Sequence, residues 1–185
     1  MRGAAAEVSP ANVNRALCYC RDCRAYLHWL EREDLLDAHG GTEIIQLARN
    51  RLRIDEGMSH VRLLRLSSRG LHRWYADCCN TPLGNTMPRI PFIGVARAMF
   101  EGVRDADATF GLRLFTNVGG AIGALPPGTR MSASGLAHVT RLMASWAWNG
   151  MGHPTPLFDR DNRPTLEPHV LGKDERQKLR EHPRA

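Results

Sequence analysis

Cys18-Tyr19-Cys20-Arg21-Asp22-Cys23 is the stretch that decides the fold, because it places three thiols within six residues. Cysteines at this spacing are typical of metal ligands. The remaining cysteines of the chain are the adjacent pair Cys78 and Cys79. The sequence therefore predicts a small zinc–thiolate domain in which the two groups of cysteines, distant along the chain, meet in space.

Length and composition indicate one ordinary globular domain. The chain has 185 residues, of which 43% are hydrophobic and 24% are charged. No apolar run approaches the ~20 residues that a spanning helix needs, and the N-terminus lacks a secretory pattern. We therefore expect a cytoplasmic protein that does not bind membranes. Five cysteines, an odd number, argue against a disulfide framework in that reducing compartment.

The basic excess does not predict a nucleic-acid partner. The formal charge of +6 treats every cysteine as neutral. One zinc ion with four thiolates would lower that charge to about +4, because metal ligands are thiolates. The basic residues are also scattered along the sequence, whereas nucleic-acid binding needs a clustered footprint.

The first half of the chain is predicted to be mainly β. Residues 1–17 form a lead-in with little structure, and a short helix leaves Cys23 through Leu30. Strands are expected at 42–47, 52–54, 61–66 and 71–75, joined by turns at residues 55–57 and 67–70. These strands should form an antiparallel meander that returns Cys78 and Cys79 to the first cluster.

The second half is predicted to add helices. Val95, Met99 and Val103 lie at helical spacing, and 112–115 alternates like a strand. Ser132 or Ser134 should cap a helix that continues through Trp146. The expected class is mainly β with added helices (α+β). One domain spans 1–158, with a C-terminal helix near 133–149. Residues 159–185 form a polar tail that docks loosely and contains a short helix at 173–180.

The spacing of the first cluster explains why zinc is the expected metal. Zinc favours tetrahedral thiolates at about 2.3 Å, and the tight knuckle between Cys20 and Cys23 lets both reach one ion. The chain must curl to include Cys18, because Cys18 and Cys20 would lie roughly 7 Å apart in a flat strand. Arg15, Arg21 and Arg24 either offset the negative charge of a three-thiolate zinc site or are solvated.

The fourth ligand decides what such a site does. We expect one Zn²⁺ per chain on Cys18, Cys20, Cys23 and Cys79, with Cys78 as the substitute for Cys79. Adjacent cysteines do not easily share one ion, so the other member of the pair should be buried as a small apolar residue. A closed four-thiolate site is structural, whereas an open position allows Lewis-acid chemistry on a bound thiol. Six histidines lack a partner at ligand spacing and are not expected to bind the metal: His28, His39, His60, His72, His138 and His153.

The two cysteine segments together resemble the glutathione-dependent formaldehyde-activating enzymes and their centromere protein V relatives. Residues 18–23 match that family's early Cys-x-Cys-x-x-Cys motif, and Tyr75-Ala76-Asp77-Cys78-Cys79-Asn80-Thr81-Pro82-Leu83 is similar to its late Cys-x-x-Cys segment. The resemblance covers about residues 15–86. It implies a β-tent fold of the Mss4-like kind. It also implies a zinc site on the three-cysteine motif, where a thiol adduct such as S-hydroxymethylglutathione binds.

The chain departs from this family pattern in two places. No cysteine precedes Cys18, although the family carries an earlier Cys-x-Cys that helps to hold a second, structural zinc. Ala76 stands where the late motif has its first cysteine, so only Cys79 matches. We therefore expect the second zinc to be absent, with Met1-Arg2-Gly3 as a possible remnant of a shortened first strand. Cys79 or Cys78 would then be free to turn toward the remaining metal.

Three functional hypotheses follow. The first is a carbon–sulfur lyase that acts on S-hydroxymethylglutathione or a related thiol adduct, with glutathione or another small thiol as its partner. Its catalytic residues are unassigned, because Asp22 and Asp77, the acidic residues nearest the motifs, fit turns better than a general base. The second is a non-catalytic structural zinc domain used for protein interaction. The third is a redox pair of Cys20 and Cys23, which the following meander disfavours because a thioredoxin-like site needs a βαβ unit.

Overall fold

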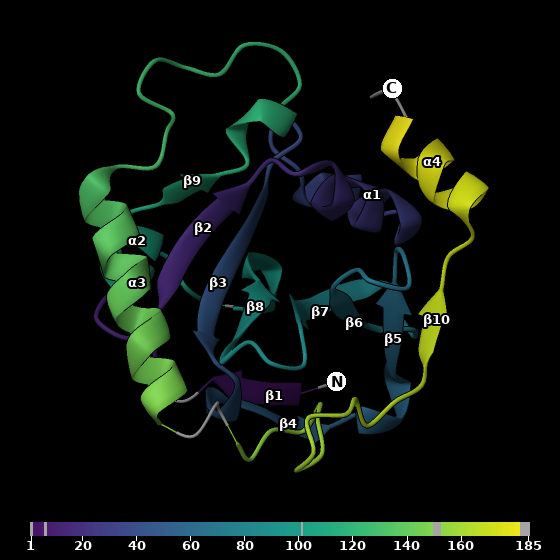
Figure 1. The fold of residues 1–185 in the computed structure, drawn as a ribbon. Helices are drawn as coiled ribbons and strands as arrows, with labels where there is room; N and C mark the ends of the chain where they lie inside the picture. Colours follow the sequence, from purple (N-terminus) through teal and green to yellow (C-terminus); the bar gives the residue numbers. More distant parts are fainter. Residues whose placement is uncertain (1, 6, 101, 150–152, 182–185) are drawn as a thin grey trace.

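An eight-stranded sheet forms the centre of the molecule, with the strand order β10-β5-β6-β7-β8-β3-β2-β9 (Figure 1). The computed structural model describes residues 2–5, 7–100, 102–149 and 153–181. The strands of this sheet are β2 (Asn14–Cys18), β3 (Thr42–Ala48), β5 (Val61–Arg65), β6 (His72–Ala76), β7 (Thr81–Thr86), β8 (Phe92–Ala96), β9 (Leu114–Thr116) and β10 (Pro168–Val170). Its interior pairs are antiparallel, and its two edge pairs, β2 with β9 and β5 with β10, are parallel.

Helices cover the sheet on two sides (Figure 1). The α-helices are α1 (Arg21–Trp29), α2 (Ala106–Phe110), α3 (Ala133–Trp148) and α4 (Lys173–Glu181). Short 3₁₀ turns lie at Glu33–Leu35, Arg49–Arg51, Met58–His60, Arg97–Met99 and Val118–Gly120. In Figure 1, α3 runs beside β2 and β9, whereas α1 and α4 lie together at the opposite end. The protein is thus a mixed α+β fold, which confirms the predicted class at this level.

The predicted helices at both ends of the chain are present. Residue Ser132 caps α3, since its hydroxyl accepts a hydrogen bond from the backbone N–H of Gly135 at 3.0 Å. Leu142 and Trp146 lie on the buried face of α3, where they pack with Ala48. Helix α1 is present, although it begins at Arg21, inside the cysteine motif and two residues before the predicted start at Cys23, and the polar segment near 173–180 forms α4. No helix in the described parts of the chain is long and apolar enough to cross a membrane.

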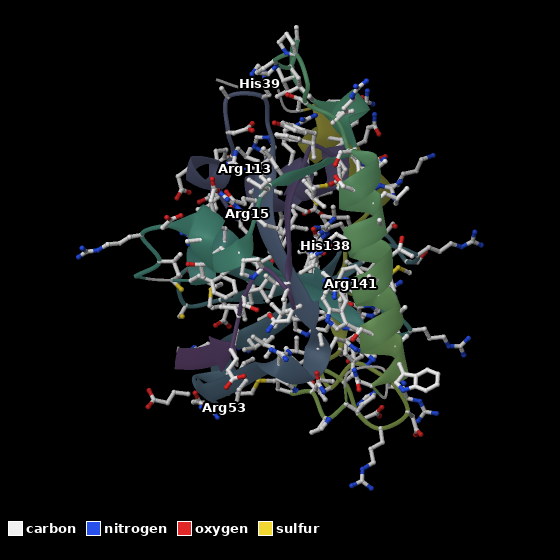
Figure 2. The ribbon with its side chains drawn as sticks, turned by 90° about the vertical axis from the view of Figure 1, so that its left-hand side faces the viewer. Arg15, His39, Arg53, Arg113, His138 and Arg141 are labelled. Atoms are coloured by element: carbon white, nitrogen blue, oxygen red, sulfur yellow. The ribbon has the colours of Figure 1, made fainter. Side chains whose placement is uncertain are left out.

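The expectation of an unstructured lead-in is wrong, because β1 (Arg2–Ala5) and β2 both lie within residues 1–17. Strand β2 is buried along its whole length, including its polar members. The Asn14 side chain donates to Gln46 at 2.6 Å, and Arg15 forms ion pairs with Glu43 and Asp107. Figure 2 views this side of the molecule, with Arg15 and Arg113 close together. Paired polar groups therefore conceal a central strand in the sequence pattern.

The predicted meander is only partly correct. Strands β5, β6, β7 and β8 are antiparallel neighbours in sequence order, but β3 pairs with β2 and β8. Strand β4 (Leu52–Glu56) instead joins β1 in a separate two-stranded sheet. Every residue of β4 is exposed or half-buried, and its half-buried apolar residues, Leu52 and Ile54, pack against the main core from this smaller sheet without pairing with β3.

The helix predicted on Val95, Met99 and Val103 is also wrong. Val95 lies in β8, which pairs with both β3 and β7, and the chain then makes a 3₁₀ turn at Arg97–Met99. The strand and the turn together bring apolar side chains to one side at spacings that imitate a helical face. Four consecutive residues of β8 are buried, and in such a short apolar run periodicity does not distinguish a strand from a helix.

The segment beyond residue 158 docks more closely than expected. Strand β10 pairs with β5, and α4 packs against α1. Arg180 also forms an ion pair with Asp22. Polar composition concealed this docking because backbone pairing and the ion pair are joined by only a few apolar contacts, those of buried Leu171 and half-buried Leu179. The division of the chain into a domain of 1–158 and a tail of 159–185 remains a prediction.

Burial of His72 on β6 predicts a pH-dependent stability. Its ring stacks on Trp74 at 5.8 Å and meets Phe158 edge-on at 5.9 Å between centroids. Burial, with a smaller contribution from Arg65, lowers the pKa of His72 to about 4. In the unfolded chain His72 takes up a proton as the pH falls below about 6.5. In the folded chain it stays neutral until the pH approaches about 4. Stability present above pH 6.5 is therefore lost as the pH falls toward 4.

We expect the free energy of unfolding, measured with urea, to fall by about 2–3 kcal/mol between pH 7 and pH 4.5 because of His72 alone. The free energy of unfolding of the variant His72→Gln should fall by about this much less over the same pH range, because glutamine does not take up a proton. An equal loss in wild type and variant would show that His72 is not responsible.

Candidate metal centre

Three sulfur atoms converge at the junction between β2 and α1. Cys18 ends β2, Cys20 caps α1 and Cys23 lies in its first turn. Their Sγ atoms all lie within 4.8 Å of one another, and Cys18 and Cys23 are buried. The backbone N–H of Cys23 points at the Cys20 sulfur at 3.3 Å, as in an N-terminal helix cap. This is the knuckle that the sequence motif predicts.

Two elements hold the first cysteine in place. Strand β2 lies between β3 and β9, so the backbone of Cys18 is paired on both sides, with Thr42 and Thr116. The chain turns sharply after Cys18, because Cys20 already belongs to the start of α1. This turn is the curl that allows the first and second thiols to approach.

A loop from far along the sequence covers the knuckle. Asn117, in the left-handed region at φ 53°, donates its side-chain N–H to the Cys18 sulfur at 3.3 Å. Gly120 lies so close that a Cβ atom there would stand 2.4 Å from the carbonyl oxygen of Tyr19. Only glycine allows this approach. The loop after β9 therefore shields the sulfurs from one side.

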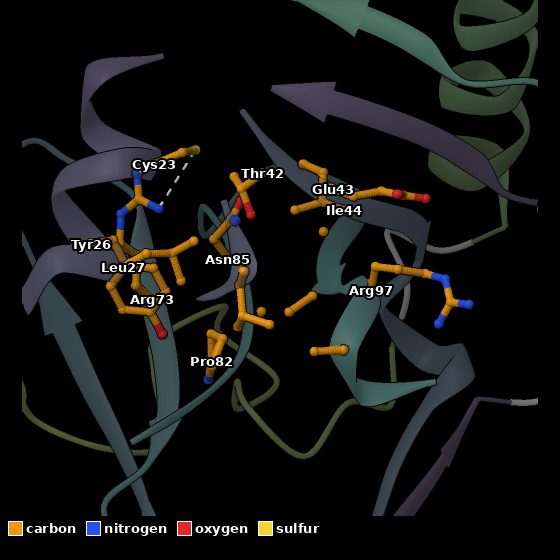
Figure 3. Close-up of a pocket in the computed structure, with 15 residues that line it drawn as sticks. Cys23, Tyr26, Leu27, Thr42, Glu43, Ile44, Arg73, Pro82, Asn85 and Arg97 are labelled. Atoms are coloured by element: carbon orange, nitrogen blue, oxygen red, sulfur yellow. Dashed lines mark hydrogen bonds between the residues drawn. The ribbon is translucent and has the colours of Figure 1, made fainter. Parts of the chain in front are cut away.

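The cluster contains buried positive charge in the form of Arg73. This β6 residue is 2% exposed, and its guanidinium nitrogens lie 3.9 and 4.0 Å from the Cys23 sulfur (Figure 3). The guanidinium also lies over the Tyr26 ring at 5.1 Å. Within the described residues, no carboxylate forms an ion pair with Arg73. A buried cation is costly without a partner, so its position indicates that the sulfur cluster carries negative charge.

The pKa values of Cys18 and Arg73 are shifted in the directions expected for a negatively charged sulfur cluster beside a guanidinium. Hydrogen bonds from Cys20 and Cys23 lower the pKa of the Cys18 thiol, against the effect of burial. Burial would lower the pKa of Arg73, but the nearby sulfurs of Cys23 and Cys20 raise it on balance. The cluster thus favours one thiolate even before any cation is considered.

The donor set fits a thiophilic cation such as zinc. A zinc ion about 2.3 Å from three tetrahedral sulfurs would hold those sulfurs about 3.8 Å apart, which the observed limit of 4.8 Å accommodates. Three thiolates and Zn²⁺ sum to one negative charge, which the guanidinium of Arg73 can offset. Cys18, Cys20 and Cys23 are thus the residues that could hold a metal.

The late cysteines do not belong to this group. Cys78 and Cys79 are both exposed, in the turn between β6 and β7. Neither is a small buried apolar residue, contrary to the expectation for the pair. The assignment of Cys79 as fourth ligand, with Cys78 as its substitute, stays a prediction. Among the described residues, the cysteines that lie within ligand distance of one another are Cys18, Cys20 and Cys23.

The arginines near the motif have separate roles. Arg15 is buried in ion pairs with Glu43 and Asp107, and Arg24 donates to the carbonyl oxygen of Gly120 at 3.1 Å. Arg24 thereby helps to hold the covering loop. Arg73 was not identified from the sequence as the charge partner of the cysteine cluster. Strand β6 is buried on both faces, so its sequence does not alternate between apolar and polar residues, and nothing in it marks Arg73 as buried.

The acidic and histidine candidates have structural partners. Asp22 pairs with Arg180, and Asp77 pairs with Arg62 at 2.6 Å and His60 at 3.4 Å. His28 bonds Glu33, and His39 bonds the carbonyl oxygen of Ile122. His138 and His153 likewise contact the Val13 carbonyl oxygen and Asn162. In the described parts of the chain, no histidine joins a three-ligand group.

A pocket of about 260 Å³ opens beside the cluster (Figure 3). Cys23 and Arg73 line one side of it, and Thr42, Asn85 and Arg97 contribute polar groups elsewhere in its wall. The wall also includes Glu43, whose carboxylate is paired with Arg15 and Arg113, and its remaining residues are mostly apolar or glycine. Cys23, one of the three cysteines of the cluster, therefore also forms part of the wall of a defined cavity.

The fold and the site define a class: a mixed α+β protein with a largely antiparallel open sheet and a buried three-cysteine cluster that could bind a metal. The model of the DUF6151 family, described as a family of unknown function, matches residues 2–167, so the chain belongs to that family. No curated protein and no solved structure matches the chain.

Removing the buried cation should destabilise the cluster. We expect Arg73→Met to lower the free energy of unfolding by about 3 kcal/mol, because the sulfurs lose their buried charge partner. Arg73→Lys keeps the positive charge, so its free energy of unfolding should fall clearly less than that of Arg73→Met. Urea unfolding of both variants measures the difference. Equal losses would mean that Arg73 acts by packing alone.

Proposed function

We propose that Cys18, Cys20 and Cys23 hold one Zn²⁺ per chain and that the adjoining pocket binds a small thiol or thiol adduct. The observation that carries this proposal is the position of Cys23, whose side chain belongs both to the sulfur cluster and to the pocket wall. A ligand in the pocket can therefore reach the cluster. A three-cysteine donor set leaves a fourth position free, as in catalytic zinc sites.

The size of the pocket limits the ligand. Its volume of about 260 Å³ lies below the roughly 300–1,000 Å³ of sites for drug-sized molecules. A low-molecular-weight thiol fits such a space entirely. A tripeptide thiol such as glutathione would place its sulfur-bearing part inside and leave its ends at the pocket mouth.

Residues of the wall supply charge and orientation. The guanidinium of Arg73 lies next to Cys23 and favours an anionic sulfur arriving there. Arg97 is held by the carbonyl oxygens of Phe100 and Val103 at 2.9 and 3.0 Å, so its charge has a fixed place. Bound zinc would supply Lewis acidity and lower the pKa of a thiol. Tyr26 and Leu27 add apolar surface to the wall.

The reaction we propose is the making or breaking of a carbon–sulfur bond, as in conversion of a thiol and formaldehyde into an S-hydroxymethyl adduct. This follows from the resemblance to glutathione-dependent formaldehyde-activating enzymes. The Mss4-like β-tent assignment belongs to the same proposal, supported by the antiparallel strands β5 to β8 beside the cysteine knuckle.

A structural zinc site is the alternative, and one observation favours it. The loop of Asn117 and Gly120 covers the cluster, and Cys20 caps α1, so a metal there would tie three parts of the chain together. Zinc-edge X-ray absorption separates the two: three sulfurs and one lighter atom favour the open site, and four sulfurs favour the structural one.

Metal content should depend on the cluster and not on the late cysteine. We expect elemental analysis of unstripped protein to give one zinc per chain. Cys20→Ser should lose most of that zinc and unfold at lower temperature, whereas the matched variant Cys79→Ser should keep both properties. Zinc loss in Cys79→Ser would instead identify Cys79 as a ligand, and metal-free wild type would remove the proposal.

Activity should require both the metal and the pocket. Zinc-loaded protein should accelerate formation of the S-hydroxymethyl adduct from formaldehyde and glutathione. Widening the polar wall with Asn85→Ala should weaken the apparent affinity for glutathione several-fold at unchanged zinc content. No turnover by fully loaded protein would eliminate this reaction while leaving the metal site intact.

A further inference from the structure

Cys78 and Cys79 form a second sulfur site that the metal centre does not use. Their Sγ atoms lie 3.5 Å apart in the four-residue turn between β6 and β7, and both side chains are exposed. Asn80, in the left-handed region at φ 50°, turns the chain directly after them. The turn is anchored on both sides, since Ala76 pairs with Thr81 across the β6–β7 ladder. The two thiols are therefore held close together at the surface.

The surroundings distinguish the two thiols. The hydroxyl of Thr81 lies 3.1 Å from the Cys79 sulfur, within hydrogen-bonding distance, whereas Cys78 meets only Cys79 among the contacts of the described residues. Arg32, on a separate segment, adds only a minor electrostatic contribution at Cys79, because its guanidinium is paired with Asp34. Asp77 is the nearest acidic residue, but its charge is engaged by Arg62 and His60. These contacts favour a thiolate on Cys79 and a thiol on Cys78.

We propose that Cys78 and Cys79 are a thiol–disulfide exchange site for low-molecular-weight disulfides, with Cys79 as the attacking sulfur and Cys78 as the resolving one. In the first step the Cys79 thiolate attacks one sulfur of the small disulfide. This step forms a mixed disulfide and releases one small thiolate, which takes up a proton.

The second step closes the pair. The Cys78 sulfur loses its proton and attacks the Cys79 sulfur, which forms the Cys78–Cys79 bond and releases the second small thiol. In total the protein loses two protons and two electrons, which the small disulfide takes up as it becomes two thiols. The distance of 3.5 Å between the two sulfurs makes resolution intramolecular and fast.

The product should be easily reversed. Neighbouring Cα atoms are about 3.8 Å apart, shorter than the roughly 4.4–6.8 Å usual across a disulfide. A bond between adjacent cysteines is therefore strained, and strained disulfides are the readily reduced ones. Excess small thiol should return the pair to its reduced form.

The sequence offers a direct test. Trypsin cuts after Arg73 and Arg89, so both thiols fall in the peptide 74–89, whereas the cluster cysteines fall in 16–21 and 22–24. We expect full-length protein treated with oxidised glutathione, then alkylated and digested, to give peptide 74–89 lighter by two hydrogens, unalkylated and without glutathione. Excess reduced glutathione before alkylation should restore the reduced peptide.

Single variants assign the two roles. Cys78→Ser should retain glutathione on Cys79, because no resolving thiol is present. Cys79→Ser should react about tenfold more slowly, because Cys78 lacks the hydrogen bond that favours a thiolate. Thr81→Val should slow the first step of the otherwise intact pair.

Three results would overturn the proposal. These are a fully alkylated peptide 74–89 after oxidation, a mixed disulfide that persists in the wild type, and cross-links between this peptide and 16–21 or 22–24. Because the readout is the oxidation of peptide 74–89, it does not depend on whether the protein holds zinc or turns over formaldehyde.

Discussion

The pairing of β2 between β3 and β9 is the constraint on which the rest of the structure depends. It fixes Cys18 at the end of a strand that is hydrogen-bonded on both sides, and Cys20, two residues later, caps α1. Because the three sulfurs are brought together by backbone pairing, the cluster does not need a flexible loop to assemble. Negative charge buried there requires a buried positive partner, which β6 provides as Arg73.

Sequence reasoning found the elements whose signals are local. The three-cysteine spacing, the apolar face of α1 and the Ser132 cap of α3 are set by residues within a turn or two of each other. It failed where distant partners decide the outcome. Asn14 and Arg15 look like surface residues until Gln46, Glu43 and Asp107 satisfy them. The pocket beside Cys23 also draws its wall from α1, from strands β3, β6, β7 and β8 and from two 3₁₀ turns, so no single stretch of sequence could indicate it.

The five cysteines divide by environment into two kinds of sulfur. Those of the cluster are shielded by α1 and by the loop of Asn117, where a cation can replace their protons. Those of the β6–β7 turn face solvent, where small molecules can reach them. The two groups are linked through β7, which starts at that turn and carries Asn85 to the pocket wall. A chemical change at the turn is thus only a few residues from the ligand.

The two parallel edge strands affect how the chain must be made. Both β9 and β10 have three residues, and each pairs with a strand synthesised long before it. Until residues 168–170 leave the ribosome, β5 has an open hydrogen-bonding edge, and open edges invite pairing between molecules. Truncation before residue 168 would leave the edge of β5 permanently uncovered. By covering that edge, strand β10 limits aggregation.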